Sequence, residues 1–118
     1  MSNQKRISEV IRDRVIASNK SFFANDNISN FIQEGELDLL QAEVQQNMDA
    51  VLRSMVIDVD NDHNMRGTAK RVAKMYIKEV FKGRYQPAPE ITTFPNAKGL
   101  DSMYVLGPIR FKSACSHH

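Results

Sequence analysis

The sequence predicts an α+β protein in which a helical region comes first and strands follow near the end of the chain. Two stretches, residues 36–57 and 68–82, carry apolar side chains at steps of three and four, the period of an amphipathic helix. Residues 102–106 and 109–114 instead have the composition of short strands, with Gly107-Pro108 between them as a bulge or edge.

The overall composition fits one soluble domain, or part of one, because 118 residues with 42% hydrophobic content suffice for a modest core. The net charge of +2 gives no reason to expect a nucleic-acid partner. No apolar run approaches the roughly 20 residues that a membrane span needs, so we expect no membrane partner. The single cysteine excludes an intrachain disulfide and suits a reducing cytoplasm, where we expect the protein to reside.

The first segment, residues 4–18, is predicted as a helix whose apolar positions are Ile7, Val10, Ile11 and Val15. Residues 21–33 are ambiguous: Asn25-Asp26-Asn27 favours a turn, and a short helical turn can follow before Gly35.

Residues 36–57 form the strongest predicted helix, because no Gly or Pro interrupts the apolar stripe. The stripe is typical of core or subunit packing and comprises Leu37, Leu40, Val44, Met48, Val51, Leu52 and Met55. The acidic stretch 58–64 lacks the ordered ligand spacing of a calcium loop, so a solvated loop with an exposed His63 is the stronger interpretation.

The next predicted helix opens at Gly67-Thr68, with Thr68 as its N-cap, and ends near Gly83. Its apolar side is predicted from Val72, Met75, Tyr76, Ile77 and Val80, and its basic side from Lys70, Arg71, Lys74, Lys78 and Lys82. Arg71 and Lys74 lie one turn apart in the first turns, where both heads and the helix dipole can meet one anion. An ordinary solvated basic face explains the same pattern about equally well.

The last residues concentrate one thiol and two imidazoles. Cys115 and His118 have a spacing at which a thiolate and an imidazole can bind one Zn²⁺, which leaves His117 free to move protons. Regular pleating would point Cys115 and His118 to opposite faces, so joint ligation requires the strand to end near Cys115. The competing interpretation is a purification-tag remnant beside a small buried cysteine.

Two blocks of the sequence, taken together, resemble the type I GTP cyclohydrolases. Residues 67–76 are similar to that family's T-P-x-R-x-A-K-M-Y helix start, and residues 109–118 to its strand ending in S-x-C-E-H-H. The order and spacing of the blocks also agree, and the resemblance covers residues 36–118 well. It implies a helical region over residues 1–100, followed at 101–118 by the first strands of the antiparallel tunnelling-fold sheet.

The resemblance also implies an activity and the roles of particular residues. The family converts GTP and water to 7,8-dihydroneopterin triphosphate and formate, and it assembles as homo-oligomers. Cys115 and His118 would ligate Zn²⁺, His117 would act as the general acid–base group, and Arg71 with Lys74 would contact the triphosphate of GTP.

Departures from the family pattern qualify these expectations. Ala69 replaces a proline, and Ser116 stands where glutamate is common. The family's third zinc ligand and its guanine-recognising glutamate come further along than residue 118. We therefore expect a truncated sheet and an N-terminal portion with little activity of its own. Two other classes remain open: a non-catalytic helical assembly or phosphate-binding module, and a small zinc module completed by a neighbouring subunit.

Overall fold

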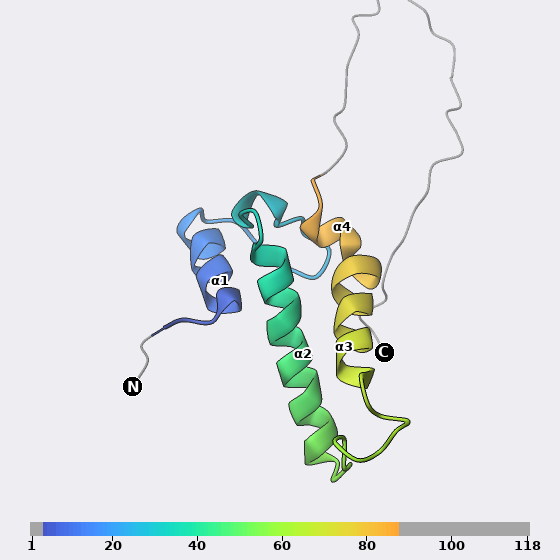
Figure 1. Cartoon of the computed structure of the whole chain (residues 1–118). Helices are drawn as coiled ribbons and strands as arrows, with labels where there is room; N and C mark the ends of the chain where they lie inside the picture. Colours follow the sequence, from blue (N-terminus) through green and yellow to red (C-terminus); the bar gives the residue numbers. More distant parts are fainter. Residues whose placement is uncertain (1–3, 88–118) are drawn as a thin grey trace, which may run out of the picture.

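The computed structural model describes residues 4–87, and Figure 1 shows that these residues are arranged as helices around a central helix α2. The elements, in order, are α1 (Ile7–Ala17), the 3₁₀ turn η1 (Ser29–Phe31), α2 (Glu36–Ser54), α3 (Thr68–Met75), the π-helix η2 (Tyr76–Val80) and α4 (Lys82–Tyr85). Helix α1 packs on one side of α2, and α3 with α4 lies on the other. Within residues 4–87, no helix is long and apolar enough to cross a membrane.

The predicted α+β class is wrong for this part of the chain, because residues 4–87 contain helices and no strand. The physical reason is that apolar residues recur here at the helical period, and the predicted strands 102–106 and 109–114 come later in the chain. The predicted strands 102–106 and 109–114, and the predicted boundary between residues 100 and 101, lie outside the described residues.

The helix boundaries differ from the predicted ones at several points. Helix α1 was expected over residues 4–18 and α2 over 36–57, and both are shorter. The expected single helix over 68–82 is interrupted, because the Tyr76 carbonyl accepts from the Phe81 amide at 2.9 Å, the five-residue step of a π-turn. Gly83 lies inside α4 and does not end the run.

Two apolar clusters hold the elements together, and α2 contributes to both. The upper cluster joins α1, the loop at Ile28, α2 and η2 through the buried residues Ile11, Val15, Ile28, Leu40 and Ile77. The lower cluster joins the end of α2 to the following loop and α3 through Leu52, Val59 and Ala69. The predicted stripe of α2 is therefore confirmed at Leu40 and Leu52, whereas Val51 and Met55 are more than half exposed.

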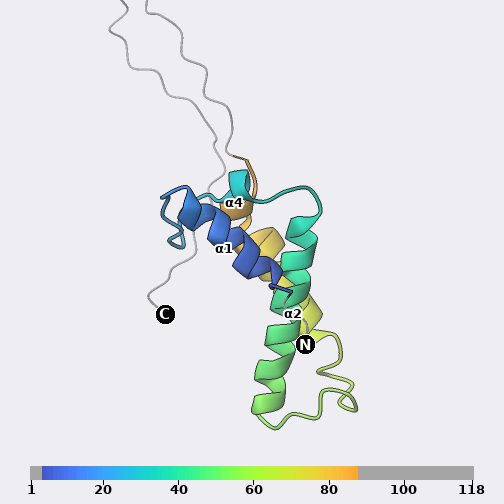
Figure 2. The ribbon, with the colours of Figure 1, turned by 90° about the vertical axis from the view of Figure 1, so that its left-hand side faces the viewer.

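The face that α3 and η2 bury differs from the predicted apolar side and shares only Ile77 with it. The buried residues are Ala69, Ala73 and Ile77, which are spaced four apart and so lie on one stripe. Two of these side chains are methyl groups, so the backbone of α3 can approach α2 closely. Met75 and Tyr76, expected on the apolar side, are 40% and 38% exposed. Figure 2 shows the same helices turned by 90°, with α1 crossing the upper part of α2.

Hydrogen bonds of charged side chains connect α1 and the loop after it to helices α2 and α4. Arg14 of α1 donates to both carboxylate oxygens of Glu36, the first residue of α2, at 2.5 and 2.9 Å. The Ser8 amide and hydroxyl both donate to Glu43. Arg84 of α4 donates to three backbone carbonyls of the loop after α1, those of Phe22, Phe23 and Asp26.

Helices α1 and α2 are each followed by a residue in the left-handed conformation, and only one of the two residues adopts this conformation without strain. Asn19 follows α1 at φ 57° and Val56 follows α2 at φ 61°. At the end of α2, the Val56 amide donates to the Arg53 carbonyl and the Ile57 amide to the Leu52 carbonyl, which is the Schellman pattern. Asparagine tolerates this conformation, but a β-branched side chain is strained in it.

We predict that Val56→Gly stabilises the fold by about 1 kcal/mol, because it removes the left-handed strain and the Val56 side chain, which is 92% exposed, buries little. Urea denaturation of the 118-residue chain measures the change. Asn19→Gly is the matched control and should shift stability by only a few tenths of a kcal/mol. A Val56→Gly protein that is no more stable than the parent would contradict the strain.

We also predict a pH-dependent contribution from Glu36, whose pKa is lowered from its ordinary 4.5, chiefly by the hydrogen bonds from Arg14. A lowered folded-state pKa means that this stabilisation is present above about pH 4.5 and is lost as the pH falls through the folded value. The stability difference between parent and Glu36→Gln should therefore be larger at about pH 6 than at about pH 3. An equal difference in stability at both pH values would contradict the proposed contribution of Glu36 ionisation to folding stability.

Candidate functional site

Gly67 is the N-cap residue of helix α3, directly before the first helical residue. Its backbone is in the left-handed conformation, with φ 80°. The predicted N-cap role of Thr68 is wrong, because Thr68 is already helical and no side chain caps this helix. The Arg71 amide donates to the Gly67 carbonyl at 3.0 Å. The amides of Ala69 and Lys70 donate to no backbone carbonyl within residues 4–87, as is usual for the first turn of a helix.

The Arg71 guanidinium lies back over this turn. Its Nη2 donates to the Thr68 Oγ1 at 3.3 Å, and its Nη1 donates to the Arg66 carbonyl at 3.5 Å. The side chain is exposed and forms no ion pair within the described part of the chain. The contact with Thr68 was missed from the sequence, although the spacing of three residues on a helix could have indicated it.

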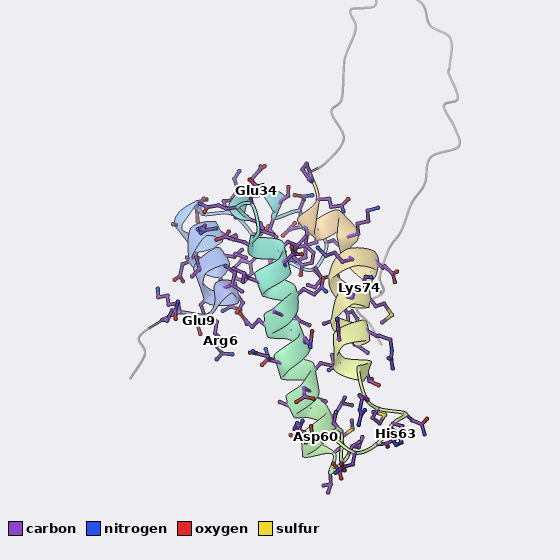
Figure 3. The ribbon with its side chains drawn as sticks, viewed as in Figure 1. Arg6, Glu9, Glu34, Asp60, His63 and Lys74 are labelled. Carbon is purple, nitrogen blue, oxygen red and sulfur yellow. The ribbon has the colours of Figure 1, made fainter. Side chains whose placement is uncertain are left out.

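Lys74 follows Arg71 by three residues on α3 and is also exposed, without an ion pair among residues 4–87. Figure 3 labels Lys74 on α3 and shows His63 in the loop between α2 and α3, where it is exposed as predicted. The structure therefore places Arg71 and Lys74 on the same helix, one turn apart, with both cationic heads accessible to an anion.

Several other basic residues near this site already have partners. Lys78 pairs with Asp38 of α2 at 3.1 Å, and Arg53 holds both Asp49 and Asp60. Hydrogen bonds from Arg53 are the main reason that the pKa of Asp60 is lowered. The residues of the predicted basic face therefore differ in whether they are paired. Lys78 forms an ion pair with α2, and the others have none within the described residues, namely Lys70, Arg71, Lys74 and Lys82.

A hollow of about 300 Å³ lies beside this turn, but it is not built from the predicted pair. Its lining comprises Gln45, Gln46, Asp49, Val59, Gly67, Ala69 and Lys70, and neither Arg71 nor Lys74 belongs to it. The Asp49 carboxylate in this lining is paired with Arg53, and Lys70 adds a positive charge without an ion pair among residues 4–87. The hollow is therefore separate from the cationic surface that carries Arg71 and Lys74.

The predicted zinc ligands Cys115 and His118, and the predicted proton-transfer residue His117, lie outside the described residues. Their relation to Arg71 and Lys74 therefore stays a prediction. Within residues 4–87, no group of three His, Cys, Asp or Glu side chains is placed to hold a metal ion, and this includes the acidic loop at 58–62.

Comparison with known proteins adds evidence that the helices alone do not give. A family model described as GTP cyclohydrolase I matches residues 44–118, which is more than half of the chain. A protein of Shewanella amazonensis named GTP cyclohydrolase 1 is 38% identical over 77 residues, 64% of this chain and 35% of that protein. The Haemophilus ducreyi protein of the same name is 38% identical over 82 residues, 69% of this chain and 37% of its own length.

A third relative, the GTP cyclohydrolase 1 of Yersinia enterocolitica, is 32% identical over 87 residues, which are 73% of this chain and 39% of that protein. The chain thus spans somewhat more than a third of the length of the curated relatives it matches. No solved structure matches the chain.

Proposed function

Because this chain belongs to the GTP cyclohydrolase I family, we propose that it supplies part of the active site for hydrolysis of GTP to 7,8-dihydroneopterin triphosphate and formate. The observation that carries the proposal is the pair of exposed cations on α3, Arg71 and Lys74, which lack ion-pair partners within residues 4–87. These two residues fall inside the segment matched by the family model.

The proposed role of the α3 turn is to bind the triphosphate of GTP. The guanidinium of Arg71 offers a planar pair of donors that suits phosphate oxygens, and Lys74 adds a compact positive charge one turn away. The positive end of the helix dipole favours the same kind of ligand. Holding the charged tail in one place also positions the guanine ring for reaction.

The proposed metal is zinc, held by Cys115 and His118. A thiolate and an imidazole are donors that zinc prefers, so the chemistry of the pair fits this ion, although a catalytic site usually has a third protein ligand. When bound, zinc supplies a Lewis acid that makes water a nucleophile near neutral pH.

The proposed role of His117 is proton transfer to the imidazole ring of the purine. Carbon C8 of guanine is a poor electrophile, and protonation of the ring nitrogen next to it favours attack by water. An imidazole with an ordinary pKa of about 6.5 holds and releases a proton near neutral pH, which suits this step.

A second candidate, from a different class, is a non-catalytic assembly module that binds phosphate. It is favoured by Val51 and Met55, which belong to the predicted packing stripe of α2 but are 52% and 57% exposed. Association of copies through this surface is also compatible with the enzyme, for which we propose a homo-oligomer. Release of formate from GTP separates the two candidates, because the assembly module would release none.

We predict that Arg71→Ala weakens GTP binding about tenfold or more, because a charge-assisted hydrogen bond to phosphate is lost. Titration calorimetry of the 118-residue chain with GTP and with inorganic triphosphate measures the effect, and both ligands should bind more weakly to a similar extent.

Lys82→Ala is the matched control, since Lys82 is exposed and has no ion pair among residues 4–87, whereas Lys78 is unsuitable because it pairs with Asp38. Equal losses in Arg71→Ala and Lys82→Ala would indicate a diffuse charge effect and would argue against a specific phosphate contact.

A separate prediction concerns the metal. Cys115→Ser should lower the zinc content of the complete gene product and abolish its release of formate from GTP, because a hydroxyl is a much poorer zinc ligand than a thiolate. Zinc is measured by elemental analysis after dialysis, and Ser116→Ala is the neighbouring control that should retain both. Undiminished turnover in Cys115→Ser would rule out this metal assignment.

A further inference from the structure

The hydroxyl of Thr68 accepts a hydrogen bond from Arg71 and does not cap the helix. Thr68 Oγ1 lies 3.3 Å from Arg71 Nη2, and no side chain caps α3. A threonine oxygen at the N-cap ordinarily accepts from a backbone amide of the first turn, but Thr68 is the residue after the N-cap. Here that oxygen holds a guanidinium, and the amides of Ala69 and Lys70 remain without a backbone partner within residues 4–87.

One further contact and the space left by a glycine help to place the same guanidinium. Arg71 Nη1 reaches the Arg66 carbonyl at 3.5 Å, so the two terminal nitrogens are held by different atoms. Gly67 makes room for them, since a Cβ at this position would lie 3.2 Å from Arg71 Nη1, closer than ordinary van der Waals contact. The backbone at Gly67, with φ 80°, is also one that other residues adopt only with strain.

We propose that Thr68 is a positioning residue that holds the Arg71 guanidinium over the start of α3 before the ligand arrives. This inference rests on the proposed binding of phosphate by Arg71. A long exposed arginine otherwise samples many rotamers, and ordering it on binding reduces affinity. A hydrogen bond to Thr68 restricts those rotamers in advance, while donors on the remaining edges of the guanidinium stay available to an anion.

The matched substitutions are Thr68→Val, which keeps the shape and β-branching but removes the acceptor, and Thr68→Ser, which keeps the hydroxyl. Calorimetric titration of the 118-residue chain with GTP should give about threefold to tenfold weaker binding for Thr68→Val. Thr68→Ser should stay within about twofold of the parent. Circular dichroism should show equal helix content in both.

A second readout follows Arg71 directly and needs no ligand. Nitrogen relaxation of the Arg71 Nε group by NMR should show a more mobile guanidinium in Thr68→Val than in the parent and in Thr68→Ser. A loss of helix structure alone would not produce this difference between Val and Ser. Unchanged Arg71 mobility in Thr68→Val would overturn the proposal.

The double variant Thr68→Val/Arg71→Ala tests whether Thr68 acts through Arg71. If it does, Thr68→Val weakens GTP binding in the parent but not in the Arg71→Ala background. An equal loss in both backgrounds would overturn the positioning role. If Arg71→Ala itself leaves GTP affinity unchanged, the proposed contact between Arg71 and phosphate is wrong. Increased Arg71 mobility in Thr68→Val would still establish that Thr68 positions the guanidinium.

Discussion

The close packing of α3 against α2 decides which side chains of α3 remain available for binding. Ala73 has no exposed surface, and Ala69 and Ile77 on the same stripe are nearly as well buried. Because a helix that buries one stripe must turn the opposite one outward, this packing leaves Arg71 and Lys74 in solvent. A larger side chain at either alanine would separate the helices, since a packed interface has little spare volume.

The helix α2 is the element on which both clusters depend. Its first half packs with α1 and η2 through Leu40, and its last turn packs with the following loop and α3 through Leu52. Within residues 4–87 no polar or charged residue is buried, so these clusters are purely apolar. The ion pair between Arg14 and Glu36 is partly buried and joins α1 to the first residue of α2.

The candidate site is local in one part and non-local in the other. The orientation of Arg71 follows from residues within one turn of it, namely Arg66, Gly67 and Thr68. The proposed zinc ligands come more than forty residues later in the chain. Hydrogen bonds from Arg84 and Asn27 tie the region of α4 to the loop after α1.

The sequence by itself determined the family, the existence of the main helices and the exposed loop at 58–64. These features depend on local periodicity and on two motifs in a fixed order, which are readable without a structure. The tertiary structure decided which face of α3 is buried, that Thr68 holds Arg71 and does not cap the helix, and that Lys78 is engaged by Asp38. Helix packing and the pairing of Lys78 depend on residues that are distant in the sequence. The choice of Thr68 between capping and contacting Arg71 depends on competition between partners, which a linear pattern does not encode.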